Sequence, residues 1–323
     1  MTLLSHSSKI VITGGSGFLG THLLNHESFQ GALAIGRTQP RNYQNFQKVS
    51  FDEDDNLAKV FNDTEVVVHA AARAHVMKDT AKSPLDEFRH VNTVGTLNLA
   101  KQAAIAGVKR FIFISTIKVL GEKTESGQPF KYDNPFNPQD PYSISKVEAE
   151  QGLKLISEFY GMEIVIIRPP LIYGQGVKGN FANLLKLARL STPMPFGSIR
   201  NKRSLVSVEN LVDLIAVCLN HPNAKNQTFL VSDDNDISTP VLFSWLSEAG
   251  GYKPYIFRFP VTLLSIALRL LGKLSIYDRL CCSMQIDIEH TKLQLNWKPS
   301  FKVKNSLCNC WLIDTGREEG LYK

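Results

Sequence analysis

The sequence predicts an α/β fold with a doubly wound parallel sheet, followed by a smaller, mostly helical C-terminal unit. In the first half of this 323-residue chain, short β-branched runs alternate with segments of helical periodicity. The runs at 66–68 and 111–114 are apolar on consecutive residues, as in strands that are buried on both faces. A glycine-rich segment at 14–20 directly follows the apolar run at 10–12, where a strand would turn into a helix.

The elements can be assigned in chain order. Strands are expected at Lys9–Thr13, Ala32–Ile35, Gln47–Ser50, Glu65–His69, Arg110–Ser115 and Glu163–Arg168. Helices are expected at Gly17–Asn25, Asn56–Phe61, Pro84–Ile105 and Tyr142–Tyr160. One more helix and one more strand, at Val206–Leu219 and Thr228–Ser232, are expected to return to the sheet. This alternation of strands and helices places the strands in one parallel sheet.

The alternation is lost after Arg168, where glycines and prolines between 174 and 195 mark a loop-rich stretch. We therefore expect a sheet domain of residues 1–172, completed by residues 205–233. A second, mostly helical domain is expected from residues 173–204 and 234–323.

Composition excludes several classes of protein. The net charge of +6 and the pI near 9.0 arise from scattered basic residues, without a basic block that would predict nucleic-acid binding. The cysteine count of five is odd, and the spacing resembles no metal site, so we expect reduced thiols, no metal and a cytoplasmic location. The oligomeric state is left open, with a homodimer as one option.

One apolar segment, Val261–Leu274, is the best candidate for membrane contact. It is shorter than the roughly 20 apolar residues that span a bilayer, and Arg269 and Lys273 interrupt it. We expect no transmembrane segment and predict a buried helix here, with peripheral membrane contact as the alternative.

The glycine-rich segment has the spacing GxxGxxG, with glycines at 14, 17 and 20. At a strand-to-helix turn, such glycines allow the backbone to approach a pyrophosphate closely. The N-terminus of the helix then offers its free N–H groups to the anion. This pattern predicts a dinucleotide site.

A second motif places Tyr142 and Lys146 one helical turn apart, on one helix face. A free tyrosine has a pKa of about 10 and transfers protons poorly at neutral pH unless a cation stabilises the phenolate. We therefore expect Lys146 to lower the pKa of Tyr142, which acts as the general acid. Thr116, after a predicted strand, is placed to hydrogen-bond the same substrate oxygen. Together with the glycine turn, these residues indicate nicotinamide redox chemistry.

These residues carry a family resemblance that covers nearly the full length of the chain. The matching segments are Thr13-Gly14-Gly15-Ser16-Gly17-Phe18-Leu19-Gly20, His69-Ala70-Ala71-Ala72, Asn92-Thr93-Val94-Gly95-Thr96, Ser115-Thr116, Tyr142 with Lys146, and Arg168-Pro169-Pro170-Leu171-Ile172-Tyr173-Gly174. The chain resembles an extended short-chain dehydrogenase/reductase of the NAD-dependent sugar epimerase/dehydratase family. The resemblance makes the sheet domain a Rossmann-like NAD(P)-binding domain and the second domain a substrate-binding one.

The resemblance also implies roles for individual residues. The cofactor-binding set is Gly14, Ser16, Gly17, Phe18, Leu19, Gly20, Arg37, Asp52, Ala70, Ala71, Ala72, Asn92, Ser115, Tyr142, Lys146 and Pro169. Asp52 would lie by the adenine, and Pro169 with Pro170 would flank the nicotinamide. Asn180 and Arg203 would lie over the diphosphate of a UDP- or dTDP-sugar, and guanidinium suits phosphate oxygens.

Two departures from the family pattern narrow the activity. The 4,6-dehydratases carry an Asp-Glu pair after the catalytic Ser/Thr, where this chain has Ile117 and Lys118, so dehydration lacks its acid and base. NAD-preferring members place an acid at the end of the second strand, where this chain has Gly36-Arg37. Arg37 favours the 2′-phosphate of NADP, with NAD as the alternative cofactor.

A narrower resemblance concerns the substrate. The segments at 72–77, 115–119 and 179–181 are similar to those of bacterial surface-polysaccharide enzymes that act at C4 of a UDP-4-keto-6-deoxy-N-acetylhexosamine. His75 and Lys118 would then contact the sugar. We therefore expect a reductase that transfers hydride to C4 of this UDP-sugar. The alternatives are a UDP-glucose or UDP-N-acetylglucosamine 4-epimerase with the same catalytic residues and, less favoured, a non-catalytic dinucleotide-binding partner protein.

Overall fold

The protein is described here by a computed structural model that covers residues 10–52, 56–74, 83–125 and 127–312. Seven strands form one sheet, in the order β3-β2-β1-β4-β5-β6-β9, and every neighbouring pair is parallel. The strands are β1 Ile10–Thr13, β2 Leu33–Gly36, β3 Phe46–Lys48, β4 Val66–His69, β5 Arg110–Ile114, β6 Glu163–Arg168 and β9 Thr228–Leu230. The predicted doubly wound parallel sheet is therefore confirmed.

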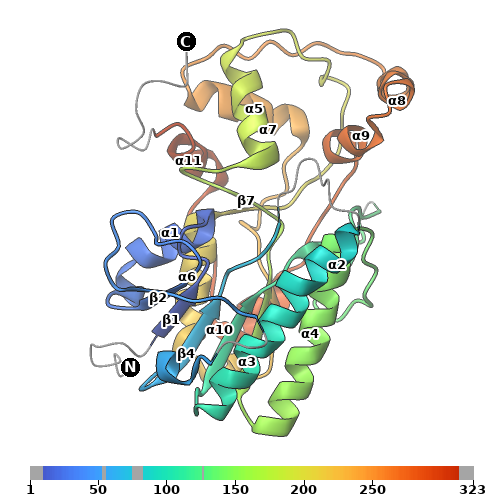
Figure 1. Cartoon of the computed structure of the whole chain (residues 1–323). Coiled ribbons are helices and arrows are strands. Elements are labelled where there is room, and N and C mark those ends of the chain that lie inside the picture. Colours follow the sequence, from blue (N-terminus) through green and yellow to red (C-terminus); the bar gives the residue numbers. More distant parts are fainter. Residues whose placement is uncertain (1–9, 53–55, 75–82, 126, 313–323) are drawn as a thin grey trace.

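Helices cover both faces of this sheet (Figure 1). One face carries α1 Phe18–Asn25 and α6 Val208–Asn220, and the other carries α3 Gly95–Ile105 and α4 Pro141–Tyr160. The strands alternate between the two cores. In β4, for example, Val66 and Val68 belong to the core of α1 and α6, whereas Val67 belongs to that of α3 and α4. The consecutive apolar residues of the sequence arise from this burial on both faces.

Short helical elements complete this part of the fold. They are η1 Glu27–Phe29, η2 Ala58–Phe61, α2 Pro84–Arg89, the π-helical η3 His90–Val94, η4 Ile117–Val119 and η5 Pro222–Ala224. The helix expected over 84–105 is thus interrupted by a π-helical turn. The helix expected over 206–219 begins two residues later, because its first residues form the end of a strand.

A third hydrophobic core lies beyond one end of the sheet, where Figure 1 shows α5, α7 and α11 gathered together. Its elements are β7 Leu171–Tyr173, which pairs with β8 Leu205–Ser207, and the helices α5 Gly179–Arg189, α7 Thr239–Ala249 and α11 Val303–Asn309. The C-terminal segment does not lie entirely with this core. Helix α10, Glu289–Leu295, packs on β9, and Met284, Ile286 and Trp297 belong to the sheet core. The expected assignment of all of residues 234–323 to the second domain differs from the structure in this respect.

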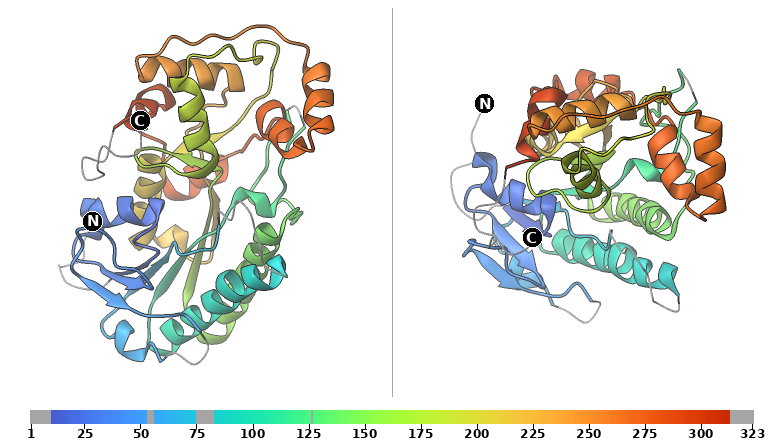
Figure 2. Two further views of the ribbon diagram at one scale, coloured as in Figure 1. Left: turned by 45° about the horizontal axis from the view of Figure 1, so that its top comes forward. Right: turned by 90° about the horizontal axis from the view of Figure 1, so that it is seen from above.

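Two further helices, α8 Val261–Leu270 and α9 Leu274–Cys281, form a hairpin at the margin of the molecule (Figure 2). The prediction of a buried helix over this segment is wrong, because α8 has no buried residue. Its apolar composition suited a core, but only one of its faces meets the protein. In the part of the chain that the structure describes, no helix is long and apolar enough to cross a membrane.

Candidate active site

The glycine turn between β1 and α1 brings the backbone of two strands close together. Gly14 has a φ of +74°, and a Cβ there would lie 2.7 Å from the Ala71 nitrogen, which follows β4. A Cβ on Gly20 would lie 2.1 Å from the Gly14 oxygen. Only glycine therefore fits at either position, one for the turn and one for the packing of α1 on it. Ser16 and Gly17 are exposed on this turn, and Phe18 opens α1.

Thr13 and His69, at the ends of β1 and β4, hold these two strand ends together. A hydrogen bond of 2.7 Å joins Thr13 Oγ1 to His69 Nδ1, and Thr13 Oγ1 accepts one from the Ala71 N–H at 3.1 Å. The other ring nitrogen, His69 Nε2, lies 2.9 Å from Thr96 Oγ1 of α3. Burial and the nearby Lys146 ammonium lower the pKa of His69 to about 3, so its ring is neutral. Ala70, Ala71 and Ala72 follow on the partly open side of this joint.

Asn92 lies in the π-helical turn between α2 and α3 and is buried. Its amide donates to the Ser145 hydroxyl at 3.0 Å and to the Arg73 carbonyl at 3.1 Å, and it accepts from the Arg73 N–H at 2.8 Å. Single π-helical turns are rare and occur often at functional sites. This turn links the loop after β4 to helix α4.

Tyr142 and Lys146 lie in the first turns of α4, with Tyr142 half-buried and Lys146 1% exposed. The helix begins in a capping box, in which Asp140 Oδ1 accepts from the Ser143 N–H at 2.6 Å. Pro141 takes the first helical position. The start of the helix, and with it the place of Tyr142, is therefore well defined.

The pKa values of these two side chains differ from what the sequence predicts. Burial raises the pKa of Tyr142, and the Asp140 carboxylate raises it further. Burial lowers the pKa of Lys146 to about 7, while Glu150 acts in the opposite direction. Lys146 Nζ lies 3.8 Å from the centroid of the Phe113 ring, a cation–π contact. The sequence predicts that Lys146 lowers the pKa of Tyr142, whereas in this structure the pKa of Tyr142 is raised.

A buried acidic residue that the sequence analysis missed lies one turn further along α4. Glu150 is 0% exposed and receives the Arg168 guanidinium through two hydrogen bonds, of 2.6 and 3.1 Å. It also accepts from the hydroxyl of Ser115, which follows β5. Tyr142, Lys146 and Glu150 are spaced i, i+4 and i+8, so the helical face that they share was the signal in the sequence.

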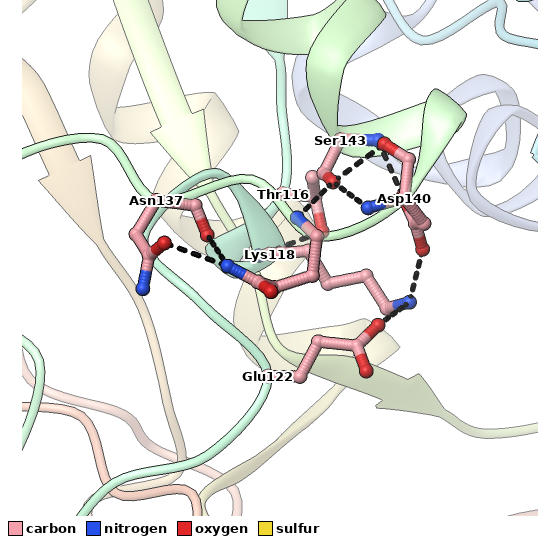
Figure 3. Close-up of polar contacts among 7 residues, drawn as sticks. Thr116, Lys118, Glu122, Asn137, Asp140 and Ser143 are labelled. Atoms are coloured by element: carbon pink, nitrogen blue, oxygen red, sulfur yellow. Dashed lines mark hydrogen bonds and ion pairs between the residues drawn. The ribbon is translucent and has the colours of Figure 1, made fainter. Parts of the chain in front are cut away.

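Lys118, expected to contact a sugar, has two carboxylate partners in this structure (Figure 3). Its Nζ lies 2.7 Å from Glu122 and 2.7 Å from Asp140, the residue that caps α4. Hydrogen bonds to both carboxylates raise the pKa of Lys118 against the effect of its burial. Its backbone N–H donates at 3.3 Å to Thr116 Oγ1, which begins the turn η4 and is 9% exposed.

The remaining predicted cofactor residues belong to several different elements. Arg37 is exposed directly after β2, and Asp52 is an exposed acid whose side chain lies 3.3 Å from His90. Leu19 is buried in α1. Pro169 follows β6, is buried, and its carbonyl accepts from the Ile117 N–H at 2.9 Å.

Of the predicted substrate residues, Lys118 and Arg203 have side chains that the structure describes. Arg203 is half-buried between Ile237 and Met284, and its guanidinium donates to the Cys282 carbonyl at 3.1 Å. Asn180 is the second residue of α5, and the description does not extend to its side chain. His75 lies outside the described residues. In the described ranges, no cluster of His, Cys, Asp or Glu is arranged to hold a metal ion.

The fold and the site together define an enzyme of dinucleotide-dependent chemistry. The glycine turn at the end of β1 suits a pyrophosphate, and the half-buried Tyr142 and the buried Lys146 lie in the first turns of α4. The sequence matches the NAD dependent epimerase/dehydratase family over residues 10–232, and the chain belongs to this family. The family expected from the motifs is thus confirmed, and so is a nicotinamide dinucleotide, NAD or NADP, as cofactor.

Individual relatives are epimerases of nucleotide sugars. A UDP-glucose 4-epimerase of Vibrio cholerae is 46% identical over 297 residues, which cover 90% of this chain and 90% of that protein. The structure of a UDP-glucose 4-epimerase from Thermotoga maritima, at 23% identity, has a TM-score of 0.75 and covers 95% of this chain and 97% of its own. A UDP-N-acetylglucosamine 4-epimerase from Bacillus cereus, at 19% identity, has a TM-score of 0.76 and covers 97% and 98%. The two structures support the fold, and the expected 4-ketoreductase activity is not confirmed by these relatives.

Proposed function

We propose that this protein is a UDP-sugar 4-epimerase, which inverts the configuration at C4 of a UDP-hexose or a UDP-N-acetylhexosamine. The observation that carries the proposal is the 46% identity to the Vibrio cholerae UDP-glucose 4-epimerase over nine-tenths of both chains. The tyrosine, lysine and threonine that such chemistry needs are all present in the site. Among the two enzymes weighed from the sequence, the epimerase is thus preferred to the reductase.

In this proposal Tyr142 moves the proton at the C4 oxygen of the sugar. The phenolic oxygen takes the proton as the C4–H bond breaks, and returns it after the sugar has turned. Thr116 hydrogen-bonds the same oxygen. A dinucleotide held at the glycine turn would accept the hydride from C4 and return it.

Lys146 supplies the positive charge that favours the tyrosinate. With a pKa of about 7, it changes charge near neutrality, and burial removes the water that would screen its effect on Tyr142. Glu150, held by Arg168, favours the charged form of this lysine. Burial and the Asp140 carboxylate raise the pKa of Tyr142, and the positive charge of an oxidised nicotinamide would act against them.

In this proposal the cofactor residues expected from the sequence hold the dinucleotide beside Tyr142 and Lys146. Gly14, Gly17 and the start of α1 would hold the pyrophosphate, and the conformation of Gly14 fits that use. Asp52 would approach the adenine, and Pro169 the nicotinamide. Arg203 and Asn180 would lie at the UDP of the substrate, and a half-buried guanidinium suits that diphosphate.

Dehydration is excluded from the proposal. The residues after Thr116 are Ile117, which is buried, and Lys118, which is bound to two carboxylates. Neither can protonate a leaving hydroxyl and deprotonate carbon as the paired carboxyls of a dehydratase do.

The reductase remains a second candidate because of one observation. The second strand ends in Gly36-Arg37 and lacks the acid that pairs with the ribose hydroxyls of NAD. An arginine there suits the 2′-phosphate of NADP, the cofactor of many biosynthetic reductases.

Two measurements separate the candidates. The purified protein is denatured and any released nicotinamide is identified, and the native protein is given UDP-glucose and UDP-N-acetylglucosamine with no added cofactor. The epimerase is expected to release NAD and to form the galacto-sugars without net change in absorbance at the nicotinamide band. Stoichiometric consumption of NADPH by a UDP-4-keto-6-deoxy-N-acetylhexosamine, with no interconversion of the hexoses, would overturn it in favour of the reductase.

A further inference from the structure

Helix α8 is apolar on both of its faces, although it lies on the surface. Val261, Leu264 and Leu268 are half-buried, and the first two pack on the third hydrophobic core, that of α5, α7 and α11. The opposite face carries Leu263, Ile266 and Leu270, which are 51%, 55% and 83% exposed. A helix that is apolar all round is ordinarily enclosed by protein or lipid. The outer face of α8 therefore has the composition of a covered surface.

The exposed apolar surface continues into the turn between α8 and α9. Leu271 is 66% exposed and Leu274, the first residue of α9, is 44% exposed. Gly272, at a φ of +66°, allows the tight turn that places these residues at the tip of the hairpin. Of the 19 large hydrophobic side chains that are exposed among the described residues, six lie between 263 and 276. We call the outer face of α8 and this tip the α8 patch.

The charged residues within the α8 patch are basic. Residues 249–277 contain no aspartate or glutamate, whereas Lys253, Arg258, Arg269 and Lys273 are basic; the next acid, Asp278, lies further along α9 and is followed by Arg279. Arg269 and Lys273 lie within and directly beside the apolar residues of the patch, and both are exposed. Exposed leucines bordered by basic residues are the composition of helices that lie in the interface of an anionic bilayer.

A second copy of this chain fits the α8 patch less well. A symmetric dimer brings the same surface of both subunits together. Such an interface would place Arg269 and Lys273 of one subunit near the equivalent residues of the other, with no acid in the segment to neutralise them. Like charges across an interface oppose association.

The position of the hairpin also suits a planar partner. Figure 2 shows α8 and α9 at the margin of the molecule in both views, away from the sheet that carries the dinucleotide site. We infer that the α8 patch docks the protein on the surface of an anionic lipid bilayer, with the leucines and isoleucine inserted and Arg269 and Lys273 at the headgroups. The inference does not depend on the reaction that the enzyme catalyses.

The test uses the full-length protein and vesicles of phosphatidylcholine with or without phosphatidylglycerol, separated by sedimentation. We expect binding to the anionic vesicles, weakened by salt, and little binding to neutral ones. The triple variant Leu263→Ser, Ile266→Ser, Leu270→Ser is expected to bind at least tenfold more weakly. The double variant Arg269→Gln, Lys273→Gln is expected to lose roughly fivefold per charge, about 25-fold together.

Matched controls carry the same changes elsewhere on the surface. Leu190, Leu293 and Leu312 are 65%, 79% and 56% exposed, and their triple replacement by serine should leave vesicle binding unchanged. The charge control is Lys48→Gln with Lys101→Gln, since both lysines are exposed. Circular dichroism and the activity of each variant show that it is folded.

Three results would overturn the inference. The first is that the full-length protein fails to sediment with anionic vesicles, and the second is that the patch and control variants bind these vesicles equally. A protein that ignores vesicles but changes from dimer to monomer in the triple variant, measured by light scattering, would make the patch an interface between copies of the chain.

Discussion

Replacement of Glu150 by glutamine removes one charge from a fully buried ion pair while keeping the size of the side chain. Arg168 and Glu150 are 3% and 0% exposed, and their closest atoms are 2.6 Å apart. Loss of one partner leaves the other charge buried without compensation, which costs about 3–5 kcal/mol in such pairs. The glutamine oxygen still accepts from Ser115 and Arg168, so we expect the lower end, about 3 kcal/mol in the free energy of unfolding.

The same substitution also affects catalysis through Lys146. Glu150 favours the charged lysine, so without it the pKa of Lys146 falls below about 7. We expect the ionisation of Lys146 in the pH profile of kcat to move to lower pH. A loss of stability alone, as measured by urea unfolding, would not shift this profile. Urea unfolding and pH profiles of the purified Glu150→Gln protein measure both effects.

The control for this prediction is Glu163→Gln, which removes a carboxylate from Arg110. That pair is also 2.6 Å long, but Glu163 is 26% exposed and lies at the other end of β6. We expect a smaller loss of stability and an unchanged pH profile. If Glu150→Gln costs no more than Glu163→Gln and leaves the profile of kcat in place, the reasoning about the buried network is refuted.

Three other outcomes are expected. Tyr142→Phe should lower kcat at least a hundredfold with cofactor binding intact, because the phenolic proton is needed only in the transition state; turnover within a few-fold of the parent would contradict this. Arg37→Ala should weaken NADPH binding by about 1.5–3 kcal/mol in titrations and leave NADH binding nearly unchanged, and equal losses would show that Arg37 does not contact the 2′-phosphate. Since the folded pKa of Lys146 is about 7 and a free lysine has about 10.4, the unfolded chain binds more protons between these values, and stability rises with pH there. Lys146→Met should therefore raise the free energy of unfolding at pH 7 and reduce its rise toward pH 10; parallel curves for the two proteins would contradict the lowered pKa.

The sequence was sufficient for the features that depend on local geometry. Gly14 and Gly20 are required by a turn of a few residues, and the contacts of their missing Cβ atoms agree with the predicted role. Tyr142 and Lys146 are paired by helical spacing alone. The order of strands and helices led to the parallel sheet in the same way.

Features that depend on distant segments could not be predicted. Glu150 belongs to the site because β5 and β6 bring Ser115 and Arg168 to it, and those residues are 35 and 18 positions away. In the π-helical turn at 90–94 each hydrogen bond spans one residue more than in an α-helix. A segment of five residues is too short for hydrophobic periodicity to reveal this difference.

The prediction that the helix at 261–270 is buried was wrong for a different reason. Hydropathy measures how apolar a segment is but not which surface covers it, so Val261 on the inner face and Leu270 on the outer face looked the same. Lys118 shows a related limit, since its two carboxylate partners, Glu122 and Asp140, were not recognised from the chain order.

The site is organised along a single helix that is fixed at two points. Asp140 caps α4 and holds Lys118 at 2.7 Å, which ties the start of the helix to the turn after β5. About one turn beyond Lys146, the other attachment is the pair of Glu150 with Arg168 at the end of β6. Tyr142 and Lys146 lie between these attachments, so their positions follow from the backbone of α4 and depend little on their own contacts. A reactive tyrosine held in this way loses little freedom when substrate binds, because the freedom has already been lost on folding.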